Sequence, residues 1–165
     1  MSVTSRFRHE NQNSIYYLKP NTADIYLLDF RIKGFSQEQL RWKRTSGHNL
    51  IPLQTMSAQI SDATIYLVGG YHNNKNSGEI QVLHDCQAID ANLTVYERDK
   101  MKTARYGSPL ALIRDRFILA ISGCTGRSSS SMTKTCEAYD TQTNHWFPIQ
   151  DLPVAVSNTS AIVMN

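Results

Sequence analysis

Long apolar runs are absent from this sequence. The longest, Phe117–Ile121, has five residues, whereas a helix that crosses a membrane needs roughly 20. The basic start of the chain is not followed by the apolar stretch of a secretory signal. We therefore expect neither membrane insertion nor secretion.

Cysteine is also scarce. Cys86, Cys124 and Cys136 form no Cys-x-x-Cys pair and match no zinc-site motif. An odd number of cysteines argues against a disulfide framework, and free cysteines favour a reducing compartment. The sequence therefore predicts a cytoplasmic protein without a metal site or a cofactor.

Arrangements typical of catalysis are missing too. The glycine pairs belong to no phosphate-binding loop motif. His84, Asp85 and Cys86 are consecutive, but consecutive residues of a strand point to opposite faces and cannot converge on one substrate. We therefore predict no catalytic residues, and a protein that is not an enzyme.

Charge of one sign is not concentrated anywhere. The chain has 17 basic and 14 acidic residues and a net charge of +3 at pH 7. A nucleic-acid-binding domain usually gathers its basic residues on one face, and the densest group here is only Arg41, Lys43 and Arg44. A solvated strand face explains that group at least as well. Nucleic acid is therefore not the expected partner, although a surface that binds RNA or another polyanion stays open as a third hypothesis.

Short apolar runs, bounded by turn residues, are what the sequence does contain. They are rich in Ile, Val, Leu and Tyr, which is typical of strands rather than helices. In chain order, the clearest runs are Ile15–Leu18, Ile25–Phe30, Ile65–Val68, Phe117–Ile121 and Ser160–Met164. The sequence predicts an all-β protein.

These runs recur with a period of about fifty residues. Ile65–Gly70 and Ile118–Gly123 lie 53 positions apart, and each is an apolar run that ends in two small residues. The spacing Asp90–Tyr96 is repeated fifty positions later by Asp140–Trp146. A repeat of this length predicts small sheets that stack on one another, because one unit cannot bury both of its faces alone.

The repeated positions have clear physical roles. Gly69 and Gly70 permit a sharp exit from a strand beside a crowded neighbour, and Asp140 caps a turn with its own side chain. Tyr96 and Trp146 are large enough to fill the space between stacked sheets. The predicted structural positions of the repeat are Trp42, Gly69, Gly70, Tyr96, Gly123, Tyr139, Asp140 and Trp146.

The unit from Met101 to Pro153 resembles a kelch repeat. Its apolar strand ends at Gly123, and the segments Glu137–Asp140 and Asn144–Trp146 follow, much like the family's glutamate-x-tyrosine-aspartate and asparagine-x-tryptophan signature. Ser122 replaces the first glycine of the pair. An earlier unit has the better double glycine, but it carries Tyr96 in place of the tryptophan.

The resemblance implies a kelch-type β-propeller arc of four-stranded antiparallel blades. The expected divisions are a tail over 1–13 and a kelch region over 14–165, with a partial blade at 14–56, blades at 57–100 and 101–153, and the first strand of a further or shared blade at 154–165. At about fifty residues per blade, 165 residues are too few to close a ring of four to eight blades. Membership of a longer propeller, self-association and cover by a larger complex all stay open.

The resemblance also places the strands of each blade. For the second blade we expect Ser57–Asp62, Thr64–Val68, Ile80–Leu83 with an extension toward Ile89, and Leu93–Glu97. For the third blade we expect Gly107–Arg114, Phe117–Ile121, Thr135–Tyr139 and His145–Pro148. A lone strand is expected over Ser157–Met164.

Binding is the function that the resemblance implies, at loops within and between the blades. Carried over by position, the candidate partner-binding residues are Tyr71, His72, Asn73, Asn74, Arg105, Tyr106 and Arg127. Arg105 beside Tyr106 suits an acidic peptide, but two other roles stay open: a structural arginine, and a tyrosine that packs on the next blade. We therefore expect a non-catalytic protein–protein interaction module or scaffold, with a kelch-type carbohydrate-active enzyme or enzyme fragment as the alternative.

Overall fold

The computed structural model describes residues 14–19, 22–29, 41–46, 57–61, 64–74 and 76–164. The tail predicted over 1–13 lies outside these residues. Within them, the regular structure is β apart from one 3-10 turn at Ser129–Ser131. No helix in this part of the chain is long and apolar enough to cross a membrane. The all-β prediction is confirmed.

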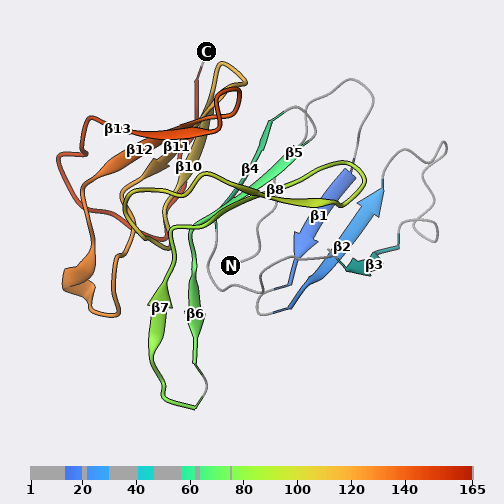
Figure 1. Ribbon diagram of the computed structural model, residues 1–165, viewed down its shortest axis with the longest axis horizontal. Coiled ribbons are helices and arrows are strands. Elements are labelled where there is room, and N and C mark those ends of the chain that lie inside the picture. The colour runs from blue at the N-terminus through green and yellow to red at the C-terminus, as the bar shows by residue number, and fades with distance from the viewer. Residues whose placement is uncertain are drawn as a thin grey trace.

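Three antiparallel sheets lie side by side in chain order (Figure 1). The first has the order β1-β2-β3, with β1 at Ser14–Leu18, β2 at Asp24–Asp29 and β3 at Lys43–Ser46. Arg44 Nη2 on β3 pairs with the Asp24 carboxylate at 2.9 Å. These are three strands of the partial blade that the sequence predicted.

The second sheet has the order β4-β5-β8-β9. Its strands are β4 at Ser57–Ser61, β5 at Thr64–Val68, β8 at Cys86–Ile89 and β9 at Val95–Arg98. The chain leaves this sheet between β5 and β8 to form a separate hairpin of β6 (Tyr71–Asn73) and β7 (Ile80–Val82).

The third strand of the second blade was therefore predicted correctly only in its extension toward Ile89, and its expected start at Ile80–Leu83 is wrong. Ile80–Leu83 contributes to the hairpin, and Cys86–Ile89 takes the position beside β5. Gly69 and Gly70 have φ angles of 63° and 107°, a conformation that glycine adopts without strain and that turns the chain away from the end of β5. All four residues of β8 are buried, so that segment gains more apolar burial in the sheet than the polar-rich hairpin does.

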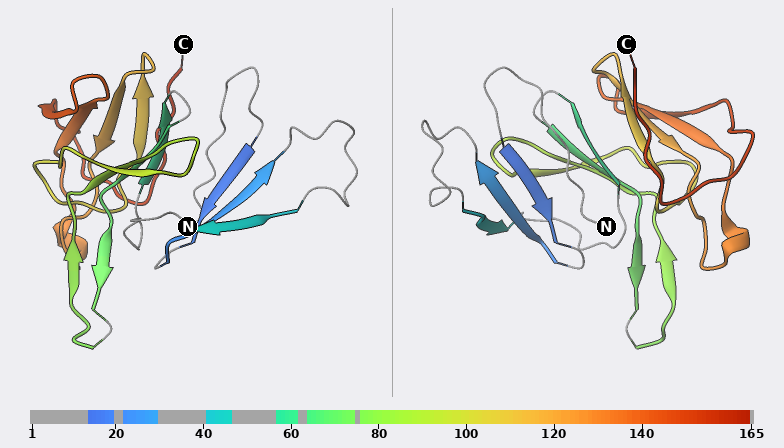
Figure 2. Two further views of the ribbon diagram at one scale, coloured as in Figure 1. Left: turned by 45° about the vertical axis from the view of Figure 1, so that its right-hand side comes forward. Right: turned by 180° about the vertical axis from the view of Figure 1, so that it is seen from behind.

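The third sheet has the order β10-β11-β12-β13. It comprises β10 at Leu110–Ile113, β11 at Phe117–Ile121, β12 at Cys136–Asp140 and β13 at His145–Ile149. Each strand lies within the segment expected for it or extends one residue beyond. Together the described sheets form an open arc rather than a closed ring (Figure 2).

Strand β5 of the second sheet is buried on both faces. On one face, Ile65 and Leu67 of β5 pack with Ile25 of the first sheet. On the other, Tyr66 and Val68 pack in a cluster with the third sheet. Successive side chains of a strand point to opposite faces, so β5 supplies both interfaces, and full burial of each large apolar side chain stabilises the arc by roughly 1.5–3 kcal/mol.

Trp146 joins the third sheet to the end of the second. Its side chain is 1% exposed, and its ring centroid lies 5.1 Å from that of Tyr139. The indole Nε1 donates a 2.8 Å hydrogen bond to the carbonyl oxygen of Asp99, just beyond β9. A buried tryptophan with a satisfied N–H combines apolar burial with a fixed orientation.

The strand expected over Ser157–Met164 is not formed, and this segment is part of none of the described sheets. The chain just before it is instead held by Ser122. The Ser122 hydroxyl accepts from Val156 N at 2.8 Å and lies 2.7 Å from the Val156 carbonyl oxygen. Ser122 has a φ of 56° where the kelch pattern has glycine, and these bonds offset the strain of that conformation.

Candidate binding groove

A groove lies between the β6–β7 hairpin and the loop that follows β11. Its volume is about 1140 Å³. We call it the hairpin groove. It is lined by His72, Asn73, Asn74, Ser77, Gly78, Glu79, Ile80, Gln81, Val82, Ala104, Thr125, Gly126 and Arg127. Four predicted partner-binding residues, His72, Asn73, Asn74 and Arg127, are therefore brought together, although they come from two different blades.

Local side-chain bonds build the tip of the hairpin. Asn74 Oδ1 accepts from Asn76 N at 3.0 Å, which is the Asx type of turn. Asn74 N donates to the carbonyl oxygen of Glu79 and Gly78 N donates to that of Asn74, at 2.9 and 2.8 Å. Gly78 has a φ of 69°, which closes the turn. The hairpin consequently projects from the end of the stacked sheets (Figure 2).

Arg127 connects the two walls of the groove. It lies in the loop after β11, and its Nη1 donates to the Gly78 carbonyl oxygen at 3.1 Å. Arg127 is exposed, and this is the only hydrogen bond of its guanidinium within the described part of the chain. Because a guanidinium has five N–H donors, the side chain retains capacity for an acceptor on a ligand.

Two tyrosines pack beneath the loops. The rings of Tyr71 and Tyr106 meet edge to face with centroids 5.0 Å apart, and Tyr106 Oη donates to the Gly126 carbonyl oxygen at 3.1 Å. Burial is the main cause that raises the pKa of Tyr106 above its ordinary value. Tyr106 thus packs on Tyr71 of the neighbouring blade, which is the packing role considered for it. Its hydrogen bond also holds Gly126, a residue that lines the groove.

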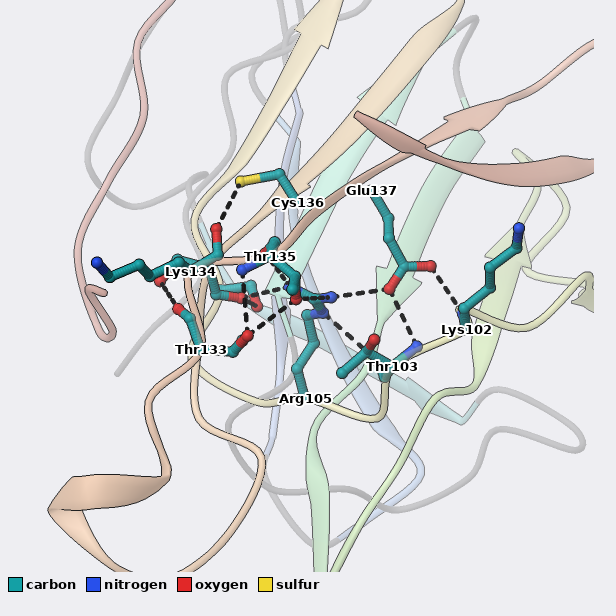
Figure 3. A network of polar contacts seen from close by, with 10 residues as sticks. Lys102, Thr103, Arg105, Thr133, Lys134, Thr135, Cys136 and Glu137 are labelled. Carbon is teal, nitrogen blue, oxygen red and sulfur yellow. Dashed lines mark hydrogen bonds and ion pairs between the residues drawn. The ribbon is translucent and has the colours of Figure 1, made fainter. Parts of the chain in front are cut away.

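Arg105 is not a surface ligand, and that prediction is wrong. The residue is 1% exposed, and its Nη1 donates to the carbonyl oxygens of Ser122 and Thr135 at 2.8 and 2.6 Å. Its Nη2 reaches Glu137 Oε1 at 2.8 Å. Figure 3 shows this network between the loop after β9 and strand β12. The buried carbonyls need donors, so the structural role explains the arginine.

The repeat positions divide into buried and exposed ones. Tyr139 and Trp146 are 1% exposed, and Asp140 accepts from Arg116 Nε at 2.8 Å. Tyr96 is 43% exposed and Trp42 is 49% exposed, so neither fills an interface between sheets as the repeat pattern predicted. Tyr96 instead donates from its hydroxyl to Asp90 at the surface, because its side chain lies on the outer strand of the second sheet, beside solvent.

Most of the groove lining was missed from the sequence. Ser77, Glu79 and Gln81 are single polar residues without a motif, and the hairpin brings them together. The segment that forms β7 was assigned to the blade itself, so the projection could not be anticipated. Within the described residues, no group of three or more His, Cys, Asp or Glu side chains is placed to hold a metal ion.

The chain is similar in structure to known proteins. No protein-family model and no curated protein matches the chain. The kelch-repeat protein YjhT matches with a TM-score of 0.73 and 14% identity, over 94% of this chain and 52% of that one. A fungal alcohol oxidase of the AA5 family, in complex with copper, matches with a TM-score of 0.65 and 15% identity, over 86% of this chain and 30% of that one.

In both matches, this chain covers only part of the matched protein. The chain spans about half the length of YjhT and less than a third of the oxidase. At these identities the likeness shows the fold alone, and it agrees with the strand order of the four-stranded sheets. The chain has the fold of a kelch-type β-propeller arc.

Proposed function

We propose that this chain is a non-catalytic interaction module of the kelch type, and that the hairpin groove is its protein-binding site. The observation that carries the proposal is the groove itself, which joins residues of two blades at one end of the arc. Its lining mixes exposed polar side chains with the half-buried Ile80 and Val82. Such a mixture suits a peptide, because apolar contacts supply affinity and polar groups fix the orientation.

The cysteines support a cytoplasmic setting for this module. Cys86, Cys124 and Cys136 are all free and buried. Burial raises the pKa of the Cys86 thiol to about 12, which keeps it in the unreactive thiol form at neutral pH. Because all three cysteines are buried, none presents its thiol to a partner.

Selection of peptides tests the proposal. A random dodecapeptide library is selected on the intact chain, and the selected peptides are measured against two pairs of variants. Asn73→Arg and Gln81→Arg place bulky cations in the groove and should reduce affinity at least about tenfold, which is about 1.4 kcal/mol. Asn92→Arg and Gln142→Arg make the same kind of change in the loops at the other end of the sheets and should leave affinity unchanged.

Two results would overturn the proposal. One is failure to select any peptide that the groove variants weaken. The other is specific binding of a sugar or stoichiometric binding of copper, which would favour the carbohydrate-active alternative instead. A glycan array and a copper titration of the intact chain provide these measurements.

A further inference from the structure

The hairpin contains a strand with one paired edge. β7 pairs with β6 and with no other strand in the part of the chain that the structure describes. In Figure 1 and in both views of Figure 2, the loop that carries Arg127 lies on the β7 side of the hairpin. The outer edge of β7 is therefore the edge next to the groove.

The hydrogen bonds at the two ends of the hairpin show which of its opposed residues form hydrogen-bonded pairs. Asn74 N donates to the Glu79 carbonyl oxygen, and Leu83 N donates to the Gly70 carbonyl oxygen, both at 2.9 Å. In an antiparallel ladder, opposed residues alternate between hydrogen-bonded and non-hydrogen-bonded pairs. These two bonded pairs determine the state of every pair between them.

Ile80 and Val82 are consequently in non-hydrogen-bonded pairs. Ile80 is opposed to Asn73, and Val82 is opposed to Tyr71. The backbone N–H and C=O groups of residues in such pairs point away from the partner strand. Two donors and two acceptors, spaced as in any strand edge, therefore line the groove side of β7.

The side chains next to this edge indicate which side chains an additional strand, paired with β7, would carry. Gln81 is exposed between Ile80 and Val82. Arg127 stands on the opposite wall with its single bond to Gly78, where it favours a carboxylate. Glu79 is exposed in the hairpin itself, so an acidic side chain is favoured beside Arg127 and disfavoured beside Glu79.

We propose that the hairpin groove binds an extended peptide as a third strand on the outer edge of β7, with an acidic side chain beside Arg127. Strand addition of this kind obtains affinity from backbone hydrogen bonds and specificity from alternate side chains. This inference rests on the proposed function, because it specifies how the groove holds a protein partner.

A backbone N-methylation scan tests the pairing. Peptides selected on the wild-type chain are resynthesised with one backbone nitrogen methylated at a time. A peptide paired with β7 should lose at least about tenfold in affinity at alternate positions, where its N–H groups donate to Ile80 and Val82, and stay within about twofold at the positions between. Losses without alternation, or no loss at any position, would overturn the pairing.

Variants of the protein test the same pairing by changing β7 instead of the peptide. Ile80→Pro removes one outward N–H and should weaken the selected peptides at least about tenfold, whereas Gln142→Arg, outside the groove, should bind them as the wild type does. The peptide scan uses the wild-type chain, so it decides the question even if Ile80→Pro does not fold. Equal binding by a folded Ile80→Pro chain would contradict the proposal.

The acidic contact has its own test. Arg127→Gln should weaken peptides that contain the acidic residue by about tenfold, and it should have no effect on the same peptides with that residue changed to its amide. Equal loss for both kinds of peptide would refute the contact with Arg127. If groove variants do not affect any selected peptide, the proposed function itself fails; if they do but the scan shows no alternation, only the strand pairing fails.

Discussion

Arg105 and Glu137 form a buried ion pair that joins the loop between β9 and β10 to strand β12 of the third sheet. Their Nη2 and Oε1 atoms lie 2.8 Å apart, and their side chains are 0% and 3% exposed. Glu137 also accepts from Lys102 N and Thr103 N at 2.7 and 3.0 Å. The loop after β9 is thus held on β12 by bonds that leave no lone charge in the interior.

Removing one partner of this pair should be costly. Arg105→Ala leaves the Glu137 charge buried without its cation and removes one donor each from the carbonyls of Ser122 and Thr135. We expect a loss of about 3–5 kcal/mol in the free energy of unfolding. The exposed Arg114→Ala should change it by less than about 0.5 kcal/mol. Denaturant titration measures both, and equal losses would contradict the structural role of Arg105.

Trp146 and Tyr96 should respond very differently to truncation. Trp146→Ala removes a side chain that is 1% exposed and should cost about 3–5 kcal/mol of stability. Tyr96 occupies the matching position of the other repeat but is 43% exposed, so Tyr96→Ala should cost less than about 1 kcal/mol. A Trp146→Ala chain as stable as the wild type would show that the two sheets are not packed as described.

Gly69 and Gly78 provide a matched pair of glycines. Their φ angles are 63° and 69°, so alanine is strained at both by about 1–2 kcal/mol. A Cβ at Gly69 would lie 2.2 Å from the Arg105 carbonyl oxygen, whereas nothing lies within 4 Å at Gly78. Gly69→Ala should therefore cost about 1–3 kcal/mol more than Gly78→Ala in the free energy of unfolding. Equal costs would refute the close approach between strand end and interblade loop.

Acid should weaken the turn after β12. Hydrogen bonds from Arg116 are the main cause that holds the pKa of Asp140 well below its ordinary value. The unfolded chain then binds more protons than the folded one, so this contribution is complete above an unfolded pKa of about 3.9 and is lost as the pH falls through the folded pKa. Thermal unfolding measured between pH 2 and 7 should show a smaller decline in acid for Asp140→Asn and for Arg116→Met. An unchanged slope in both variants would refute the pairing.

Sequence reasoning identified the arc because the signals of its strands are local. The apolar runs that became β2, β5 and β11 each end at turn residues, and the double glycine after β5 marks a backbone that must leave the sheet. The third repeat was predicted most closely, since its aromatic position holds a tryptophan that is buried. Tyr96 shows the limit of the pattern, because equal spacing does not guarantee that the outer strand is covered.

The groove was predictable only in part. His72, Asn73, Asn74 and Arg127 follow from their places after β5 and β11, where the resemblance puts binding loops. The β6–β7 hairpin did not follow, because Ile80–Val82 has the same apolar pattern as a blade strand, and only pairing distinguishes them. Arg105 was misplaced because the sequence shows an arginine beside a tyrosine and does not show which carbonyls it satisfies.

The central claim is that a partner binds at the hairpin groove and not at the opposite end of the sheets. Amide chemical-shift mapping tests this claim most directly. A selected peptide is titrated into the isotope-labelled intact chain, and the shift changes are assigned along the backbone. The account predicts the largest changes in the hairpin, from His72 to Val82, and in the loop from Thr125 to Arg127. Changes confined to the loops at the opposite end, around Asn92 and Gln142, would contradict it.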